Sequence, residues 1–411
     1  MSDRDASPRS RRRVLFVAEA VTLAHVARLV TLARSLDPRR YEVCLAADNR
    51  YRSVIGDLTF PVRDISTISK ARFSDALARG APLYTTKDLI GYVEEDRRLI
   101  DSFRPDLVVG DFRLSLGISA ALCKVPYSTV TNAYWSPYAL VDVPVPEIAL
   151  TTVLGVRAAQ LVFNLVRPLA FAFHAVPLNG ARKRYGLPYL PFDLRETYTH
   201  ADHTLYADIP EQVPTRDLPP NHKFIGPVLW SPATELPEWW GGLPLDKPLI
   251  YVTLGSSGLS KLLPTVLQAL QAFPVVVVAA TAGEPFPRAI PGNARVASYL
   301  PGQAVASRAT LVICNGGSPT CQQGLVAGRP VLGIADNLDQ LLNMETLMRQ
   351  GAGICLRAKR TSADEIAAGV RKILNEPGIR ANAERLAVSF AGYDAPRLFA
   401  EHVENCCQEP A

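Results

Sequence analysis

The stretch that decides the fold is LVICNGGSPTCQQGLVAGRPVLGIADNLDQ, which runs from Leu311 to Gln340. A short apolar run leads into a pair of glycines, a segment with helical spacing follows, and a second apolar run ends in DNLDQ. This order predicts a strand, loop, helix and strand of a parallel sheet. In such sheets ligands bind at the carboxyl ends of the strands, where loop amides and helix N-termini hold anions.

The same alternation runs along the whole chain of 411 residues, whose length fits two domains of ordinary size. Helical spacing follows each short apolar run rich in β-branched residues, as in HVARLVTLARSL after the first run. The runs cover residues 14–18, 42–47, 106–111, 249–255, 275–280, 310–317 and 330–336. The pattern predicts an α/β protein with two doubly wound parallel-sheet domains.

A segment between these halves predicts the domain boundaries. Residues 217–248 are rich in proline and carry three of the four tryptophans, which suits an interdomain connection. The predicted organisation is a disordered tail (1–12), a first domain (13–220), a linker (221–247), a second domain (248–385) and a C-terminal helix that crosses back to the first domain (386–411).

Composition restricts the classes of partner and compartment. Apolar residues make up 48% and charged residues 20% of the chain, as in soluble globular proteins. The net charge of +5 is small and lies partly in the N-terminal tail, so we expect no nucleic-acid partner. Glu19, His25 and Arg28 interrupt what would be the apolar core of an export signal. The seven cysteines show no metal-ligand spacing, which indicates reduced thiols in a cytoplasmic protein and no metal site.

Residues 148–176 form an unusually apolar segment. Its polar side chains Arg157, Gln160, Asn164 and Arg167 are spaced by three, four and three residues and so share one helical face. One interpretation is a helix packed on the first domain with this stripe facing water. The other is a helix on a membrane surface, or one lining an apolar substrate channel, which would make the protein peripheral at the inner membrane face. The polar stripe argues against a transmembrane span.

Two glycine-rich loops predict an anion site in the second half of the chain. TLGSSGLS contains Ser256 and Ser257, and CNGGSPTCQQ contains Gly316, Gly317 and Ser318. Both follow apolar runs, and together they suit a diphosphate. A P-loop lysine pattern and a G-x-G-x-x-G motif after the first strand are both lacking, which argues against ATPases and nicotinamide enzymes.

The order YLPGQ, NGGSPTCQQGLVAGRP and DNLDQ resembles the donor-site signature of the family 1 glycosyltransferases, which have the GT-B fold. The family pattern is an aromatic-x-Pro-Gln, then His-x-Gly-x-x-Ser/Thr-x-x-Glu, Gly-Val-Pro and Pro-x-x-x-Asp-Gln. LAHVAR, RPDLVVGDF and FIGPVLW extend the resemblance beyond this region. It implies two Rossmann-like domains that face a cleft and a nucleoside-diphosphate sugar as donor, with uridine and thymidine both open.

The resemblance assigns donor roles to matching positions. Tyr299 would stack on the base and the Leu300 backbone would pair with the base edge. Asn315 stands where the family has a histidine that donates to the diphosphate, and Gln323 where it has a glutamate that binds the ribose. The loop between them contains Gly316, Gly317, Ser318 and Thr320. Asp339 and Gln340 match the pair that binds the transferred sugar.

His25 matches the family's general base and Asp111 the aspartate that orients it. The usual neighbouring glycine is Ala24, and the usual proline three residues later is Arg28. The chemistry is reasonable, because a hydroxyl attacks poorly until a base removes its proton. A buried carboxylate fixes the histidine tautomer and stabilises the imidazolium.

We therefore expect an inverting glycosyltransferase, monomeric or homodimeric, that moves a hexose to a lipophilic small molecule without an obligatory metal. Asn132, Tyr134, Trp135 and the apolar segment would bind the acceptor. Two alternatives stay open: a nucleotide-sugar 2-epimerase, which needs carboxylates around the sugar, and a non-catalytic nucleotide-sugar-binding protein, which Asn315 and Gln323 suggest.

Overall fold

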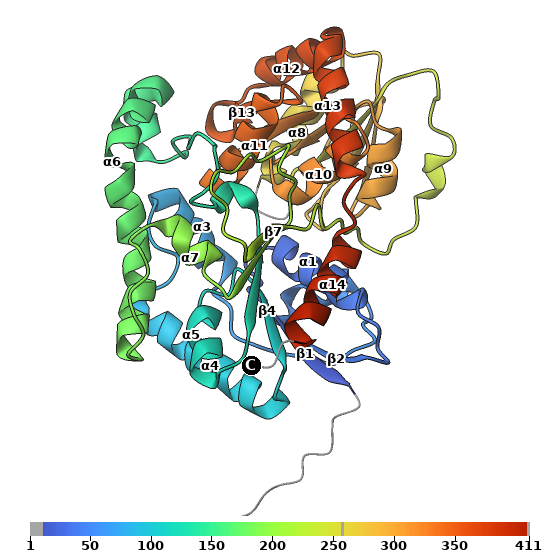
Figure 1. Cartoon of the computed structure of the whole chain (residues 1–411). Coiled ribbons are helices and arrows are strands. Elements are labelled where there is room, and N and C mark those ends of the chain that lie inside the picture. The colour runs from blue at the N-terminus through green and yellow to red at the C-terminus, as the bar shows by residue number, and fades with distance from the viewer. Residues whose placement is uncertain (1–10, 256–258, 409–411) are drawn as a thin grey trace, which may run out of the picture.

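The computed structural model describes residues 11–255 and 259–408. The chain folds into two α/β domains, with helix α6 along one side of both (Figure 1). The first sheet has the order β3-β2-β1-β4-β5-β6-β7 and the second β10-β9-β8-β11-β12-β13. Every strand pair is parallel, as between β1 and β4 and between β8 and β11. The predicted architecture of two doubly wound domains is confirmed.

The strands are β1 (Arg12–Ala18), β2 (Tyr41–Ala46), β3 (Val62–Arg63), β4 (Leu107–Asp111), β5 (Tyr127–Thr131), β6 (His203–Tyr206), β7 (His222–Phe224), β8 (Leu249–Thr253), β9 (Val276–Ala280), β10 (Ala294–Ala297), β11 (Leu311–Cys314), β12 (Val331–Ala335) and β13 (Gly353–Arg357). The helices are α1 (Leu23–Arg34), α2 (Arg52–Ile55), α3 (Lys70–Arg79), α4 (Thr86–Phe103), α5 (Leu116–Cys123), α6 (Ala149–Arg184), α7 (Leu194–Thr199), α8 (Leu263–Leu270), α9 (Gly302–Arg308), α10 (Ser318–Val326), α11 (Leu338–Arg349), α12 (Ala363–Asn375), α13 (Pro377–Phe390) and α14 (Ala395–Gln408). The central strands are buried on both faces, because helices cover each sheet on both sides.

The element boundaries differ in detail from the predicted domain limits. Strand β1 begins at Arg12, within the segment predicted as a tail, and β7 lies within the predicted linker. Strand β7 is short and forms the edge of its sheet, where neighbouring prolines are tolerated. Helix α14 returns to the first domain, where Phe399 packs on Phe16 with ring centroids 5.8 Å apart (Figure 1).

Helix α6 departs from the prediction of a single polar stripe that faces water. Gln160 turns toward the protein: its Oε1 accepts from the Val145 amide at 2.7 Å and its Nε2 donates to the Val143 carbonyl at 3.0 Å. Most of the solvent-facing surface of α6 is instead apolar. The interpretation of a stripe that faces water is wrong for Gln160, because its polar side chain satisfies backbone groups of the preceding segment, whereas Arg157 and Asn164 are exposed.

Arg113 lies at the centre of a buried ion cluster beside the carboxyl ends of β1 and β4. The guanidinium is fully buried and contacts Glu19 at 2.9 Å, Asp96 at 3.0 Å and Glu95 at 2.8 Å. Burial raises the pKa of Glu19 and of Asp96, although the charge of Arg113 opposes this. The cluster joins the loops after both strands to α4 and so supports the residues that follow β1 and β4.

We expect Arg113→Met to destabilise the protein by about 3 kcal/mol or more, because two buried carboxylates lose their cation. The free energy of unfolding in urea measures this. Arg380→Met is the matched control, since Arg380 forms an exposed pair with Glu384 and its loss should change stability little. Equal effects of the two substitutions would contradict the role given to the cluster.

Candidate active site

A cavity of about 600 Å³ lies between the carboxyl ends of the two sheets and is lined by both domains. Ser256 and Ser257 lie outside the described residues. Of the other predicted site residues, all except Gly316 line this cavity. From the first domain these are His25, Asp111, Asn132, Tyr134 and Trp135, and from the second Tyr299, Leu300, Asn315, Gly317, Ser318, Thr320, Gln323, Asp339 and Gln340.

His25 and Asp111 meet on the first-domain side of the cavity. His25 lies in the first turn of α1, and Asp111 is the last residue of β4, which pairs with β1. The distance from His25 Nδ1 to Asp111 Oδ1 is 2.7 Å. Because an ionised carboxylate only accepts hydrogen bonds, Nδ1 carries a proton and donates it to Asp111, so in the neutral imidazole Nε2 is the nitrogen with the free lone pair. The imidazole also stacks on Phe112, with ring centroids 4.9 Å apart.

Arg28 is a residue of this site whose role the sequence did not reveal. It lies one helical turn after His25 and contacts both oxygens of Asp111, Nε to Oδ2 at 2.8 Å and Nη2 to Oδ1 at 2.9 Å. Burial alone would raise the pKa of Asp111, but the charges of Arg28 and His25 outweigh it and the pKa is lowered. Asp111 is therefore ionised, with both of its oxygens engaged. A lone arginine among the buried residues of α1 was the available signal.

Asn132, Tyr134 and Trp135, predicted to bind the acceptor, bridge the two domains. The Asn132 Nδ2 donates to Ser318 Oγ at 2.9 Å. Tyr134 Oη and Trp135 Nε1 both donate to Asp339 Oδ1, at 3.1 Å and 2.8 Å. These side chains thus line the cavity and also connect its two walls.

Asp208, which follows β6, is a second buried carboxylate beside the cavity that was missed from the sequence. It accepts hydrogen bonds from Asn132 Nδ2 at 3.1 Å, from the Ala133 amide at 2.6 Å and from Gln322 Nε2 at 3.0 Å. Burial raises the pKa of Asp208 to about 6, although these donors and Arg28 oppose the shift. Because Gln322 belongs to α10, Asp208 also ties the first domain to the donor loop.

The loop between β11 and α10 has the backbone geometry of an anion site. Asn315 Oδ1 accepts from the Gly317 amide at 3.1 Å. Gly316 has a φ of 78°, and a Cβ there would lie 2.8 Å from Met344 Cγ, so only glycine fits. Gly255 also has a positive φ, and a Cβ there would lie 2.8 Å from Asn315 Nδ2. The two glycine-rich loops therefore approach each other closely at the N-terminus of α10.

The remaining donor-side residues are held by their surroundings. Gln323 Nε2 donates to the Trp230 carbonyl at 2.7 Å, which fixes the amide against the linker. Gln340 Oε1 accepts from the Asp336 amide at 2.9 Å. A Cβ on Gly283 would lie 2.4 Å from Tyr299 Oη, so this glycine leaves room for the phenol.

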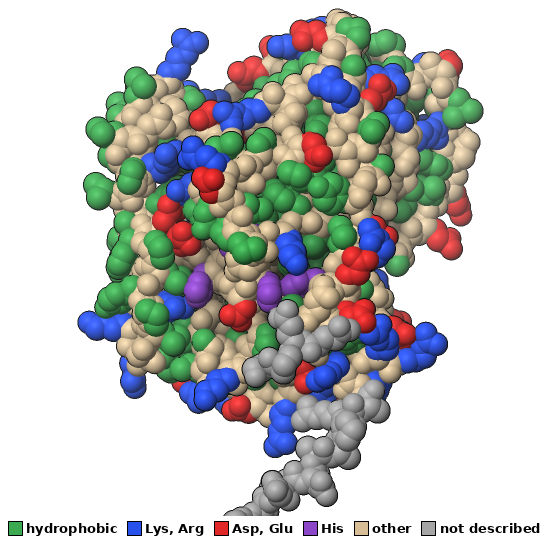
Figure 2. Space-filling view, in the orientation of Figure 1, with side chains coloured by type: hydrophobic (Ala, Val, Ile, Leu, Met, Phe, Trp, Pro, Cys, Tyr) green, Lys and Arg blue, Asp and Glu red, His purple; other side chains and the backbone are tan. Residues whose placement is uncertain are grey.

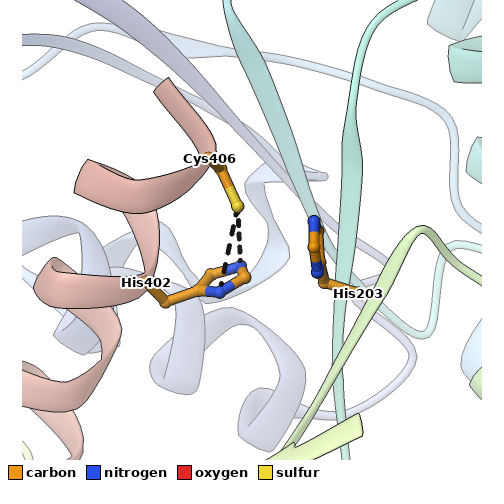
Figure 3. A group of neighbouring side chains, drawn as sticks. All are labelled: His203, His402 and Cys406. Atoms are coloured by element: carbon orange, nitrogen blue, oxygen red, sulfur yellow. Dashed lines mark hydrogen bonds between the residues drawn. The ribbon is translucent and has the colours of Figure 1, made fainter. Parts of the chain in front are cut away.

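A group of possible metal ligands lies outside the cavity. His203 of β6 and His402 and Cys406 of α14 have ligand atoms within 4.8 Å of one another (Figure 3). His203 is at the amino end of its strand, whereas the cavity lies at the carboxyl ends. Burial lowers the pKa of His402 to about 3, so the imidazole is neutral. Cysteine spacing could not reveal this group, because it contains a single cysteine and His203 is distant in the sequence from His402 and Cys406.

Comparison with known proteins gives close relatives. A "PGL/p-HBAD biosynthesis rhamnosyltransferase" of Mycobacterium bovis (strain BCG / Pasteur 1173P2) is 51% identical over 404 residues, which cover 98% of this chain and 89% of the relative. A "PGL/p-HBAD biosynthesis glycosyltransferase" of Mycobacterium tuberculosis (strain ATCC 25177 / H37Ra) is 49% identical over 395 residues, covering 96% and 92%.

Solved structures share the fold at lower identity. The spinosyn rhamnosyltransferase SpnG complexed with thymidine diphosphate has a TM-score of 0.70 and 19% identity, covering 96% of this chain and 100% of that one. The same enzyme with spinosyn aglycone has a TM-score of 0.67, also at 19% identity, with coverages of 95% and 100%. These neighbours confirm the GT-B fold.

Residues 264–406 match the family described as "Erythromycin biosynthesis protein CIII-like, C-terminal domain". This match covers the predicted donor signature. The named relatives support sugar transfer and disfavour the epimerase and the binding protein considered from the sequence. The chain is a glycosyltransferase of the GT-B fold and belongs to the family of the PGL/p-HBAD biosynthesis glycosyltransferases.

Proposed function

We propose that the protein is an inverting glycosyltransferase that moves a deoxyhexose, with rhamnose as the first candidate, from thymidine diphosphate to a hydroxyl of a lipophilic acceptor. The observation that carries the proposal is the His25 and Asp111 pair, 2.7 Å apart, in one cavity with the β11 to α10 loop. The sugar is suggested by the rhamnosyltransferase relative, and the nucleotide by the thymidine diphosphate complex of SpnG.

In the proposed reaction, Nε2 of His25 removes the proton of the acceptor hydroxyl. The acceptor oxygen forms a bond to the anomeric carbon while the bond from that carbon to the diphosphate oxygen breaks, with inversion. Asp111 stabilises the imidazolium through Nδ1, and the proton then passes to solvent.

The negative charge that develops on the diphosphate needs stabilisation. The N-terminus of α10 and the amides of its glycine loop can supply it, because their donors are fixed before the reaction. We propose that these groups and Asn315 make a metal ion unnecessary. Asp339 and Gln340 would bind the sugar, with Asp339 held by Tyr134 and Trp135.

The acceptor side of the cavity is apolar. Its wall includes Phe73 and Leu77 of α3 and Phe163 and Phe171 of α6. Such a wall binds apolar groups by removing their surface from water. We therefore propose a lipophilic acceptor that places one hydroxyl near His25. A nucleotide-sugar epimerase would have no use for such a wall.

We expect His25→Ala to reduce sugar transfer by about 100-fold or more, because the proposed base that removes the acceptor proton is lost. The measurement is transfer of radiolabelled sugar, together with the Kd for thymidine diphosphate, which should not change. His222→Ala serves as the control, since His222 does not line the cavity. Transfer at the wild-type rate by His25→Ala would disprove the proposed base.

Arg28 is proposed to hold Asp111 in position and keep it ionised, since its guanidinium contacts both oxygens of the carboxylate. Burial raises the pKa of Asp111 and the charge of Arg28 lowers it, so removal of this charge should raise that pKa. Because the site needs an ionised Asp111, the acid limb of the pH profile of kcat/KM should move to higher pH in Arg28→Gln. Arg28→Lys keeps the charge and should move it less. An unchanged limb in Arg28→Gln would exclude this electrostatic role.

Asn315→His should bind thymidine diphosphate roughly fivefold more tightly, because a charged donor replaces a neutral one. Isothermal titration calorimetry measures the Kd, with Asn315→Ala as the control that removes the donor. Asn315 Oδ1 also holds the Gly317 amide. Weaker binding together with a lower Tm in Asn315→His would show that this loop contact matters more than donation to the ligand.

A further inference from the structure

Helix α6 exposes a row of large apolar side chains along one side of the molecule, the left edge in Figure 2. Leu161, Leu165 and Leu169 are 73%, 81% and 75% exposed. Their spacing of four residues places them one turn apart on the same helical face. Further exposed apolar side chains of this helix are Val153, Leu154, Val162, Val166, Phe173 and Val176. An apolar surface of this extent marks an interaction site.

The charges of α6 identify the kind of partner. The sequence from Ala149 to Arg184 contains no aspartate or glutamate. Arg157 lies before the leucine row, and Lys183 and Arg184 lie after it, all of them exposed, whereas Arg167 lies between Leu165 and Leu169 and is half-buried. An apolar face with cations at its ends is typical of helices that rest on an anionic bilayer, with the cations at the headgroups.

The attachment of α6 shows how it would meet a bilayer. The helix is long and apolar enough to cross one, and 22% of its most apolar window is buried. However, Phe163 and Phe171 are buried in the protein, Arg360 donates to the Thr151 carbonyl, and Asn179 Nδ2 donates to the Leu190 carbonyl at 3.1 Å. The backbone is not helical at Gly155, where the helix bends, and on both sides of this bend one face is held by the protein. Only the opposite face is available to lipid, so α6 would lie along the surface.

The same helix forms a wall of the active-site cavity. Phe163, Phe171 and His174 line the cavity that also contains His25. Val166 lines it too and is 39% exposed, so the cavity wall reaches the outer surface of α6. The apolar surface is thus continuous with the space for the acceptor.

We propose that α6 docks on the anionic surface of a lipid bilayer and that the acceptor enters the cavity from this bilayer, beside Val166. The entry route rests on the proposed function, whereas the docking does not. A second copy of the chain fits α6 less well. A symmetric antiparallel pairing of two α6 helices would bring Arg157 of one copy near Lys183 and Arg184 of the other.

The test is co-sedimentation of the full chain with vesicles of phosphatidylcholine alone or with added phosphatidylglycerol. The wild type should bind the anionic vesicles more strongly. The triple variant Leu161→Asn, Leu165→Asn and Leu169→Asn should bind about tenfold or more weakly, because its apolar face is lost. None of the three leucines lines the cavity. The triple variant Arg157→Gln, Lys183→Gln and Arg184→Gln should lose the preference for phosphatidylglycerol.

The matched control is Leu245→Asn with Val388→Asn. These apolar side chains are 88% and 77% exposed but lie in the linker and in α13. The control should bind vesicles as the wild type does. Equal binding by the control, the leucine variant and the wild type would overturn the proposal. So would a lipid-free dimer that the leucine substitutions dissociate, because α6 would then bind a second copy.

Transfer assays separate this proposal from the proposed function. The leucine variant should retain the wild-type rate with a short, water-soluble acceptor that carries the reacting hydroxyl and lose rate with an acceptor embedded in vesicles. Equal losses with both acceptors would overturn entry from the bilayer. Vesicle binding without transfer to either acceptor by the wild type would leave the docking surface intact and refute the proposed function.

Discussion

The buried carboxylate of Asp111 is the constraint on which the active site depends. A charge removed from water requires close partners, and Asp111 finds them in Arg28 and His25 of α1. Both partners lie on one helical turn, so the carboxylate fixes the direction of α1 relative to β4. The same contacts select the tautomer of His25 that leaves Nε2 free. The position of the base and its tautomer therefore have the same cause.

Hydrogen bonds continue from this carboxylate to the second domain. Arg28 donates to Asn132 at 2.7 Å, and Asn132 donates to Ser318 at the start of α10. Asp339 is held from the first domain in the same way by Tyr134 and Trp135. Side chains of the first domain, which carries the proposed base, thus position Ser318 and Asp339 of the second domain, which carries the donor loop. The same hydrogen bonds therefore fix both the relative placement of the two domains and the geometry of the site.

Helix α6 has apolar side chains on two faces, and the two faces serve different surroundings. The inner face, with Phe163 and Phe171, closes the cavity, while the outer leucines face outward. A helix inside a soluble core would bury both faces. The absence of carboxylates from α6 agrees with an outer face suited to anionic surroundings, and a lipophilic acceptor suits the inner one.

The sequence by itself determined the two parallel sheets and the donor loop, because strand runs such as 311–314 and the glycine loop after them are local patterns. It also gave His25 and Asp111 as a pair through resemblance to a family. The contacts of Arg28 and of Asp208, and the approach of His203 to His402 and Cys406, were decided by tertiary structure, since each brings together residues distant in the sequence. Periodicity reports that a helix has an apolar face, but only packing decides whether protein or solvent meets it. The exposure of the leucines of α6 therefore became visible only in the folded chain.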